Sequence, residues 1–442
     1  MATGIMLKYL TKRNILIGNG VLLILSLPII LMSKEIADFD VSVYYGTFYC
    51  VLLMTYLRSE TGSYFSPVSI FLCFYWMMLL GRPFLIQSGL LTNDIVEASP
   101  YNSTGVFQAN VYLVITLLVT GFAFLLFDFT YFPSMPEIQF PEFVVSDKVK
   151  LILWISFFIS GLLMLNDGKN AYYALQDSNY IALIQSGEIV YFNQIYYTIL
   201  KWSWFLLFIA VPERSTLITI LFLLFLIALP VSGMRGYFIL YLLMGLMFLE
   251  GKKIIHLKLI IILPFIFGLL SLVTFLLEYR LGFSVSDGGL IAPIYKAIFD
   301  QGSTYEVVYG AIEFRDKLNF IQNVIIPSVF NYPAFGNYVD KLRGVNFAEG
   351  VGFATSALAE IVSGGLLVWL IYISSIGFAL NVLHKAYLNL KRSNGYYFTL
   401  FFISPVVWGQ PRGSLLQFLL KFLIFLILIF VFHKIRVKKI KL

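Results

Sequence analysis

Three arginines in the sequence are each followed directly by glycine, in the stretches GMRGY, KLRGV and QPRGS, which contain Arg235, Arg343 and Arg412. A guanidinium group offers a planar fork of donors that grips phosphate oxygens two at a time, and it stays charged at any relevant pH. A neighbouring glycine, such as Gly236, lets the backbone approach a ligand closely. The pattern therefore predicts that an anionic ligand, such as a lipid-linked phosphate or pyrophosphate, binds near these residues.

Further residues belong to the same candidate anion site. Arg280 and Arg315 lie with Arg343 in one long segment of mixed polarity, and Tyr279 beside Arg280 adds a ring that could stack on a sugar. The alternative is that these arginines bind phospholipid head groups or pair with acids such as Glu278 and Asp316. The sequence leaves both interpretations open.

Glu360 is the main candidate for acid–base chemistry. It stands in the apolar stretch GVGFATSALAEIVSGGLLVWL, roughly two turns into an expected membrane span. A carboxylate at that depth is costly and marks a functional group that faces protein or water. In the orientation derived below, the three histidines lie on the inner side of the membrane and the arginines on the outer side. A base beside the arginines must therefore be a carboxylate. Glu360 is the first choice, ahead of Glu278, Glu349, Asp287, Asp300 and Asp340. The alternative role for Glu360 is a buried ion pair with one of the arginines.

No motif indicates a cofactor. The sequence has neither a GxxxxGK[ST] loop for a nucleotide nor a histidine–carboxylate spacing typical of a metal site. We therefore expect no metal and no cofactor, although acids in the long segment 278–352, which is expected on the outer side, could still hold an ion. The net charge of +7 does not indicate nucleic-acid binding, because lysine and arginine in membrane proteins mostly record orientation.

Composition places these residues in a membrane protein. Of the 442 residues, 59% are hydrophobic and only 12% charged, against about a quarter charged in soluble domains. Apolar runs of roughly 17–25 residues, the length that spans a bilayer, recur along the whole chain. We expect one integral, all-α membrane domain over residues 1–442, without a separate soluble domain or a cleaved leader peptide. Cys50 and Cys73 fall in apolar runs and are expected to be core residues.

The apolar runs predict about twelve spans. They cover 14–32, 41–57, 65–87, 107–127, 149–165, 195–212, 215–232, 235–250, 255–277, 353–383, 396–410 and 414–432. The short neighbours 215–232 and 235–250 are either a tight hairpin or a broken or re-entrant pair.

The distribution of positive charge predicts the orientation. With the N-terminus inside, most of the 31 lysines and arginines fall in inside loops and in the C-terminal tail, as the positive-inside rule requires. Both termini are therefore expected inside. Lys201 and Lys421 fall within spans, where they can extend toward the inner side or pair internally.

The outer side carries the arginines and one dominant segment, residues 278–352. Its apolar stretches, such as IAPIYKAIF and VVYGAIEF, predict short helices packed at the membrane surface. A segment of this length without a function is uncommon.

Taken together, these features resemble the Wzy-type O-antigen polymerases, which join oligosaccharide repeat units. The resemblance covers nearly the whole chain as architecture, and it implies a GT-C-like architecture of the kind found in polymerases and ligases. At residue level it rests on three stretches: SGMRG at 232–236, GVGFATSALAEIVSGG at 350–365 and QPRGS at 410–414.

The resemblance implies a glycosyl transfer at the periplasmic face of the bacterial inner membrane. The growing glycan would pass from undecaprenyl pyrophosphate to the terminal sugar of a new lipid-linked repeat unit. Cations would stabilise the leaving pyrophosphate. The expected catalytic residues are Glu360, Arg235 and Arg280, and the expected substrate-binding residues are Gly236, Arg343, Arg412, Arg315 and Tyr279. A separate chain-length regulator is an expected partner.

Two other functions stay open at this stage. An O-antigen ligase has a similar architecture and outer arginines, but such enzymes are associated with an essential histidine in the large outer loop, and none is expected outside here. A polysaccharide transporter or flippase should line a route through the membrane with polar groups, whereas these cations gather on one face.

Overall fold

The described part of the chain is almost entirely helical. This computed structural model describes residues 14–25, 27–28, 41–90, 103–130, 142–177, 194–231, 235–254, 298, 302–327, 335–343, 356–389, 393–435 and 439–441. Five helical stretches are long and apolar enough to cross a membrane, and three shorter apolar helices accompany them. The expected all-α, multi-pass fold is therefore confirmed. The division into a single domain over 1–442 with an outer loop over 278–352 stays a prediction.

The elements follow one another along the chain as short and long helices with two short strands. The first half contains α2 (Ser42–Thr61), α3 (Pro67–Tyr75), the π-helix η1 (Trp76–Leu80), α4 (Gly81–Gln87), α5 (Ser103–Thr130), β1 (Glu142–Val144), α6 (Asp147–Asp177), α8 (Gln194–Ala210) and η3 (Pro212–Arg214). It is followed by α9 (Ser215–Phe225), α10 (Ala228–Val231), α11 (Arg235–Gly251), α14 (Ser303–Glu313), η5 (Arg315–Lys317), η6 (Ile321–Ile325) and α16 (Phe335–Leu342). The C-terminal part contains α17 (Ala357–Asn389), α18 (Asn394–Trp408), η7 (Gln410–Arg412), α19 (Leu415–Ile435) and β2 (Lys439–Lys441).

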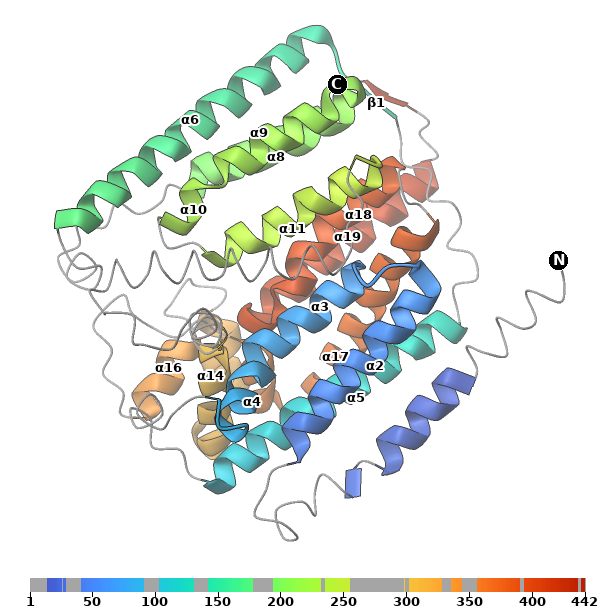
Figure 1. Cartoon of the computed structure of the whole chain (residues 1–442), viewed down its shortest axis with the longest axis vertical. Coiled ribbons are helices and arrows are strands. Elements are labelled where there is room, and N and C mark those ends of the chain that lie inside the picture. Colours follow the sequence, from blue (N-terminus) through green and yellow to red (C-terminus); the bar gives the residue numbers. More distant parts are fainter. Residues whose placement is uncertain are drawn as a thin grey trace, which may run out of the picture.

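The long helices run between two ends of one bundle (Figure 1). At one end α14 packs against α5, α16, α17 and η1; we call it the α14 end. At the other, β1 pairs in parallel with β2, with Glu142 facing Lys439 in the register; we call it the opposite end. Phe208 near the end of α8 and Phe248 near the end of α11 both contact the ring of Tyr397, which begins α18. Helix α18 leads into η7, which packs against η1 at the α14 end, so α18 begins at the opposite end. Helices α8 and α11 end beside its first turn and therefore start at the α14 end.

The spans differ in how much of their surface other helices cover. In the stretch Pro67–Gln87, 72% of an apolar 18-residue segment is buried by the rest of the protein. In Asp147–Tyr173, within α6, only 22% of such a segment is buried. Along α6, Leu151, Ile152 and Leu162 are exposed. Because other helices leave these side chains uncovered, α6 lies at the periphery of the bundle.

Helices occupy all the expected spans except 255–277, which lies outside the described residues. Two spans differ from the prediction. Helix α6 continues well beyond 165, so Tyr172 and Tyr173 are helical and not part of a loop. The expected span 215–232 is broken, because α9 ends at Phe225 and α10 begins at Ala228. Pro230 explains this break, since it cannot donate to the carbonyl four residues earlier and its ring clashes there.

The outer segment contributes α14, η5, η6 and α16, so the expectation of short helices is confirmed. Its most apolar helix does not lie at the surface, however. Val307, Val308, Tyr309 and Ala311 on α14 are fully buried, and the helix packs against α5 and α17. Helix α14 is therefore part of the bundle core at the α14 end.

Helix α17 changes direction at Gly365. This residue has φ 69° and ψ −168° inside an otherwise helical run, a conformation essentially restricted to glycine. The break separates the first turns of α17, which carry Glu360, from the long apolar remainder. These first turns are fixed to α5, because the Tyr112 hydroxyl donates to the Leu358 carbonyl oxygen at 3.0 Å.

Replacing Gly365 with alanine should therefore destabilise the fold. A side chain there has open space around it, so the cost comes from the backbone alone, about 1–3 kcal/mol. Equilibrium unfolding in mixed micelles would measure it. Gly18→Ala is the matched control, because Gly18 also has open space but an ordinary helical backbone. Equal stability of both variants would contradict the strained backbone.

Candidate active site

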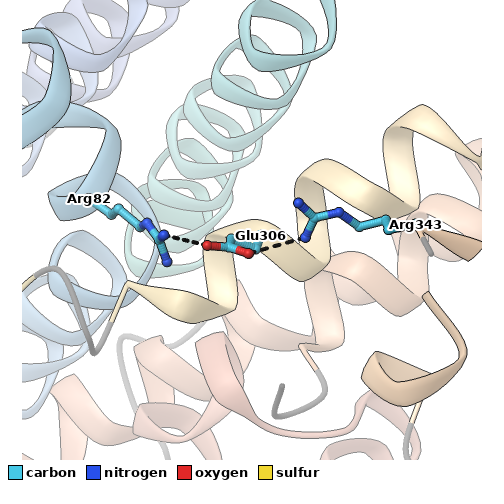
Figure 2. Close-up of polar contacts among 3 residues, drawn as sticks. All are labelled: Arg82, Glu306 and Arg343. Carbon is cyan, nitrogen blue, oxygen red and sulfur yellow. Dashed lines mark hydrogen bonds and ion pairs between the residues drawn. The ribbon is translucent and has the colours of Figure 1, made fainter. Parts of the chain in front are cut away.

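Two arginines share one carboxylate in the interior of the α14 end (Figure 2). Arg82 on α4 forms a salt bridge with Oε1 of Glu306 on α14. The Nη1 of Arg343, just after α16, lies 3.1 Å from Oε2 of the same carboxylate. The exposed fractions of the three side chains are 8%, 4% and 6% in the order Arg82, Glu306, Arg343. We call these residues the arginine–glutamate triad.

The triad carries two positive charges and one negative charge in a buried position. Burying charges is costly unless each has an opposite charge and hydrogen bonds, and here one carboxylate serves two guanidinium groups. The guanidinium carbon of Arg343 also lies 5.5 Å from the centre of the Tyr309 ring, a favourable cation–π contact. The net positive charge suits a region that receives an anion.

Local sequence explains how the triad assembles. Glu306 occupies the first turn of α14, where the helix dipole favours a negative charge. One turn later, Gly310 has no side chain, and a Cβ there would press on Val339 and Arg343. Glycine therefore allows α16 and the residue after it to lie directly against α14.

Sequence analysis named Arg343 as a binding residue but assigned no role to Arg82 or Glu306. The signal for Glu306 was an acid inside the apolar stretch TYEVVYGAI. A lone buried carboxylate requires a cationic partner, but nothing in the sequence indicates that two distant arginines supply it. Only the packing of α14 against η1 and α16 brings the three together.

Glu360 holds the beginning of another helix. Its Oε2 accepts a hydrogen bond from the backbone N–H of Leu415, the first residue of α19, at 2.7 Å and one from the Ser414 hydroxyl at 3.3 Å. Glu360 is buried and itself lies in the first turn of α17, rather than two turns into it as expected. The N-terminal ends of both helices therefore meet at this side chain.

The turn that Glu360 holds contains Arg412. The short helix η7, formed by Gln410–Arg412, connects α18 to α19 and packs against α17 and η1. It therefore lies beside the helix that leads into Arg82. The structure describes only the backbone of Arg412, and this backbone is at the α14 end.

The other predicted residues lie on other elements of the bundle or outside the described residues. Arg235 and Gly236 begin α11, whose main contacts are with α9, α10 and α18 and not with α14. No heavy atom lies within 4 Å of a Cβ placed on Gly236, so this position is open. Arg315 is exposed in η5, close enough to act electrostatically on Tyr112. Arg280 and Tyr279 lie outside the described residues.

Comparison with known proteins decides the family. The family model for the O-antigen polysaccharide polymerase Wzy matches residues 15–440. The chain belongs to this family. An "O-antigen polymerase" from Escherichia coli is similar to this polymerase, with 23% identity over 412 residues that cover 88% of this chain and 87% of the relative. No solved structure matches it.

Membership defines the general activity of this polymerase. The family implies a glycosyltransferase-type polymerase that acts on lipid-linked oligosaccharides. The resemblance noted in the sequence is therefore confirmed. The residues that perform the transfer are not identified by the match and have to be argued from the geometry.

A second charged group lies at the opposite end of the polymerase. Glu60, Asp128 and His384, from α2, α5 and α17, place possible ligand atoms within 4.8 Å of one another, a geometry that could hold a metal ion. The Nζ of Lys385 already lies 2.6 Å from Oδ1 of Asp128. Sequence analysis did not predict this group, because its members are far apart in the chain. Its position at the opposite end separates it from the arginines.

Proposed function

We propose that this polymerase transfers the growing glycan from undecaprenyl pyrophosphate to the terminal sugar of a new undecaprenyl-pyrophosphate-linked repeat unit. The chain would be multi-pass in the bacterial inner membrane, with both termini cytoplasmic and the α14 end periplasmic. The observation that carries the proposal is the net positive triad of Arg82, Glu306 and Arg343, together with the nearby turn of Arg412, in a member of the polymerase family.

The chemistry needs little beyond positioning and positive charge. A hydroxyl oxygen of the acceptor sugar attacks the anomeric carbon of the donor sugar, while the bond from that carbon to the pyrophosphate oxygen breaks. Negative charge develops on the pyrophosphate, and fixed guanidinium groups stabilise it. The hydroxyl proton leaves to a base or to water. The donor carries its own activated leaving group, so the transfer requires no nucleotide.

The candidate residues divide into two groups in this proposal. Arg412 and Arg343 would bind the pyrophosphate, with Arg82 and Glu306 holding Arg343 in place. Arg235, Arg280 and Arg315, with Tyr279 and Gly236, stay proposed contacts to the donor or its glycan. A chain-length regulator is a further proposed partner.

The test of function is the surface polysaccharide ladder of a strain in which the gene is deleted and then restored. Collapse of the ladder to a single repeat unit, reversed by the restored gene, is the expected result. Loss of all glycan from the lipid core, with long lipid-linked polymer accumulating, would indicate a ligase instead. Repeat units trapped on the cytoplasmic side would indicate a flippase.

Glu360 is proposed here to position the Arg412 turn. Sequence analysis predicted a general base, but Oε2 of Glu360 accepts from both Ser414 and Leu415. These contacts support a carboxylate that fixes the start of α19. The base role stays a prediction, and the two roles give different results for two variants.

Glu360→Gln and Glu360→Ala separate the two roles. Glutamine keeps an oxygen that can accept from Leu415, whereas alanine removes it, and loss of a helix cap costs about 0.5–2 kcal/mol. A positioning role predicts near-normal chain lengths for Glu360→Gln and shortened polymer for Glu360→Ala. If Glu360→Gln were as inactive as Glu360→Ala while folded normally, the general-base role would be supported.

A further inference from the structure

Two lysines lie within the membrane-spanning part of the bundle and close to each other. Lys201 is on α8 and Lys421 on α19, each about 10 Å along its helix from the α14 end, from the helical rise per residue. Helices α8 and α19 line one pocket, so the two lysines lie at similar depths on neighbouring helices. Among the described residues, neither lysine forms an ion pair with a carboxylate. Two cations at this depth favour a bound anion.

The Lys201 ammonium lies among aromatic rings. Its Nζ is 5.7 Å from the centre of the Tyr197 ring, 5.9 Å from Trp202 and 5.7 Å from Tyr241. Tyr197 is one turn earlier on α8, so the side chain extends toward the α14 end and not toward the inner side, as sequence analysis considered. Side chains on a helix favour this direction, and it brings the charge toward the head-group region.

An apolar pocket lies next to this pair of cations. Its volume is about 270 Å³, and it lies between α6, α8, α18 and α19. The lining residues include Trp202, Phe205, Phe402 and Leu428. Trp202 connects the two features. Its ring lies near the Nζ of Lys201, and the centre of its ring is 5.5 Å from the centre of the Phe402 ring.

Helical register places the lysines and the pocket in one line. Phe205 follows Lys201 by four residues on α8, and Leu428 follows Lys421 by seven residues on α19, so each pair shares a helix face. From the α14 end toward the opposite end, the crevice between α8 and α19 therefore presents two cations first and an apolar pocket next. An anionic lipid has the same order of charge and hydrocarbon.

We propose that this crevice binds the polyprenyl phosphate lipid of the substrate, with its phosphate at Lys201 and Lys421 and its hydrocarbon chain in the pocket. This inference rests on the proposed function, which requires such a lipid at the α14 end. The crevice opens on the lipid-facing surface, since Lys421 is exposed, so the lipid enters from the side. The glycan then lies at the head-group level, where the Arg412 turn and the triad are located.

Native mass spectrometry of the purified full-length protein tests the proposal. Undecaprenyl phosphate and dioleoyl phosphatidylglycerol are titrated separately. The wild type should bind undecaprenyl phosphate at least tenfold more tightly, and Lys201→Gln with Lys421→Gln should remove most of this preference. Leu428→Trp, which fills the pocket without changing charge, should weaken it as well. Lys169→Gln is the matched control, because Lys169 is an exposed lysine that contacts the ring of Tyr173 on α6.

Two outcomes would overturn the proposal. Equal binding of both lipids would identify an ordinary phospholipid site. Unchanged binding both in the variant with Lys201→Gln and Lys421→Gln and in Leu428→Trp would place the lipid elsewhere. Lys201→Arg with Lys421→Arg should restore binding if charge is what matters. Lipid binding and the polysaccharide ladder are measured independently, so a failed crevice is distinguishable from a failed polymerase assignment.

Discussion

Glu306→Gln should lower the stability of the folded protein more than any other single substitution proposed for it. The variant keeps the shape of the side chain but leaves Arg82 and Arg343 buried without the carboxylate that both contact. Breaking a buried ion pair by removing one partner costs about 3–5 kcal/mol. Equilibrium unfolding in mixed micelles should show this loss, together with reduced yield from the membrane.

Two variants serve as controls for this result. Glu313→Gln changes the exposed last residue of the same helix and should be close to neutral. Glu306→Gln combined with Arg343→Gln removes one of the two cations that lose this carboxylate, so it should recover part of the stability, and the double-mutant cycle would give the coupling between the two residues. A stable Glu306→Gln single variant would show that the triad does not hold α14, α4 and α16 together.

Arg412→Ala should produce the largest loss of activity. In the proposed function this guanidinium stabilises the leaving pyrophosphate, and removing one such group costs about a hundredfold to a thousandfold in rate. The ladder should collapse to its shortest rungs. Arg412→Lys should restore little, because an ammonium group cannot grip two phosphate oxygens in the same plane.

The interpretation of Arg412→Ala requires a folded protein. Arg214→Ala is the matched control, since Arg214 is an exposed arginine in the short helix η3 at the opposite end, and it should leave the ladder unchanged. Stability and membrane insertion of Arg412→Ala should equal those of wild type. A full ladder from Arg412→Ala would remove this residue from the proposed site.

The helices were predictable because membrane spans are defined by local composition. Apolar runs long enough to cross a bilayer located helices such as α5 and α19 to within a few residues. Helix ends were harder. Pro230 was the sequence signal for the break between α9 and α10. Helix α6 extends past its apolar run, and its last turns carry polar residues such as Asn166 and Lys169, which are tolerated beyond the apolar region.

The candidate site was predictable in kind but not in its pairings. The three arginine–glycine stretches indicated where cations would gather, and Arg343 and the Arg412 turn are indeed at one end of the bundle. The partners of these residues depend on tertiary packing. Glu306 is used by two arginines from distant segments, and Glu360 accepts a hydrogen bond from the first residue of α19. No local pattern in the sequence specifies such contacts.

The uneven burial of the spans has an evolutionary consequence. A peripheral helix such as α6 has to be helical and apolar, so many sequences satisfy it. The stretch Pro67–Gln87 must fit neighbours on nearly every side, because 72% of its apolar segment is buried, against 22% for α6. Such close packing tolerates few changes of volume. Substitutions should therefore accumulate around the rim of the bundle over time, while α3, η1 and α4 preserve the ancestral sequence best. Searches for remote relatives that weight these interior positions should reach further than searches over the whole chain.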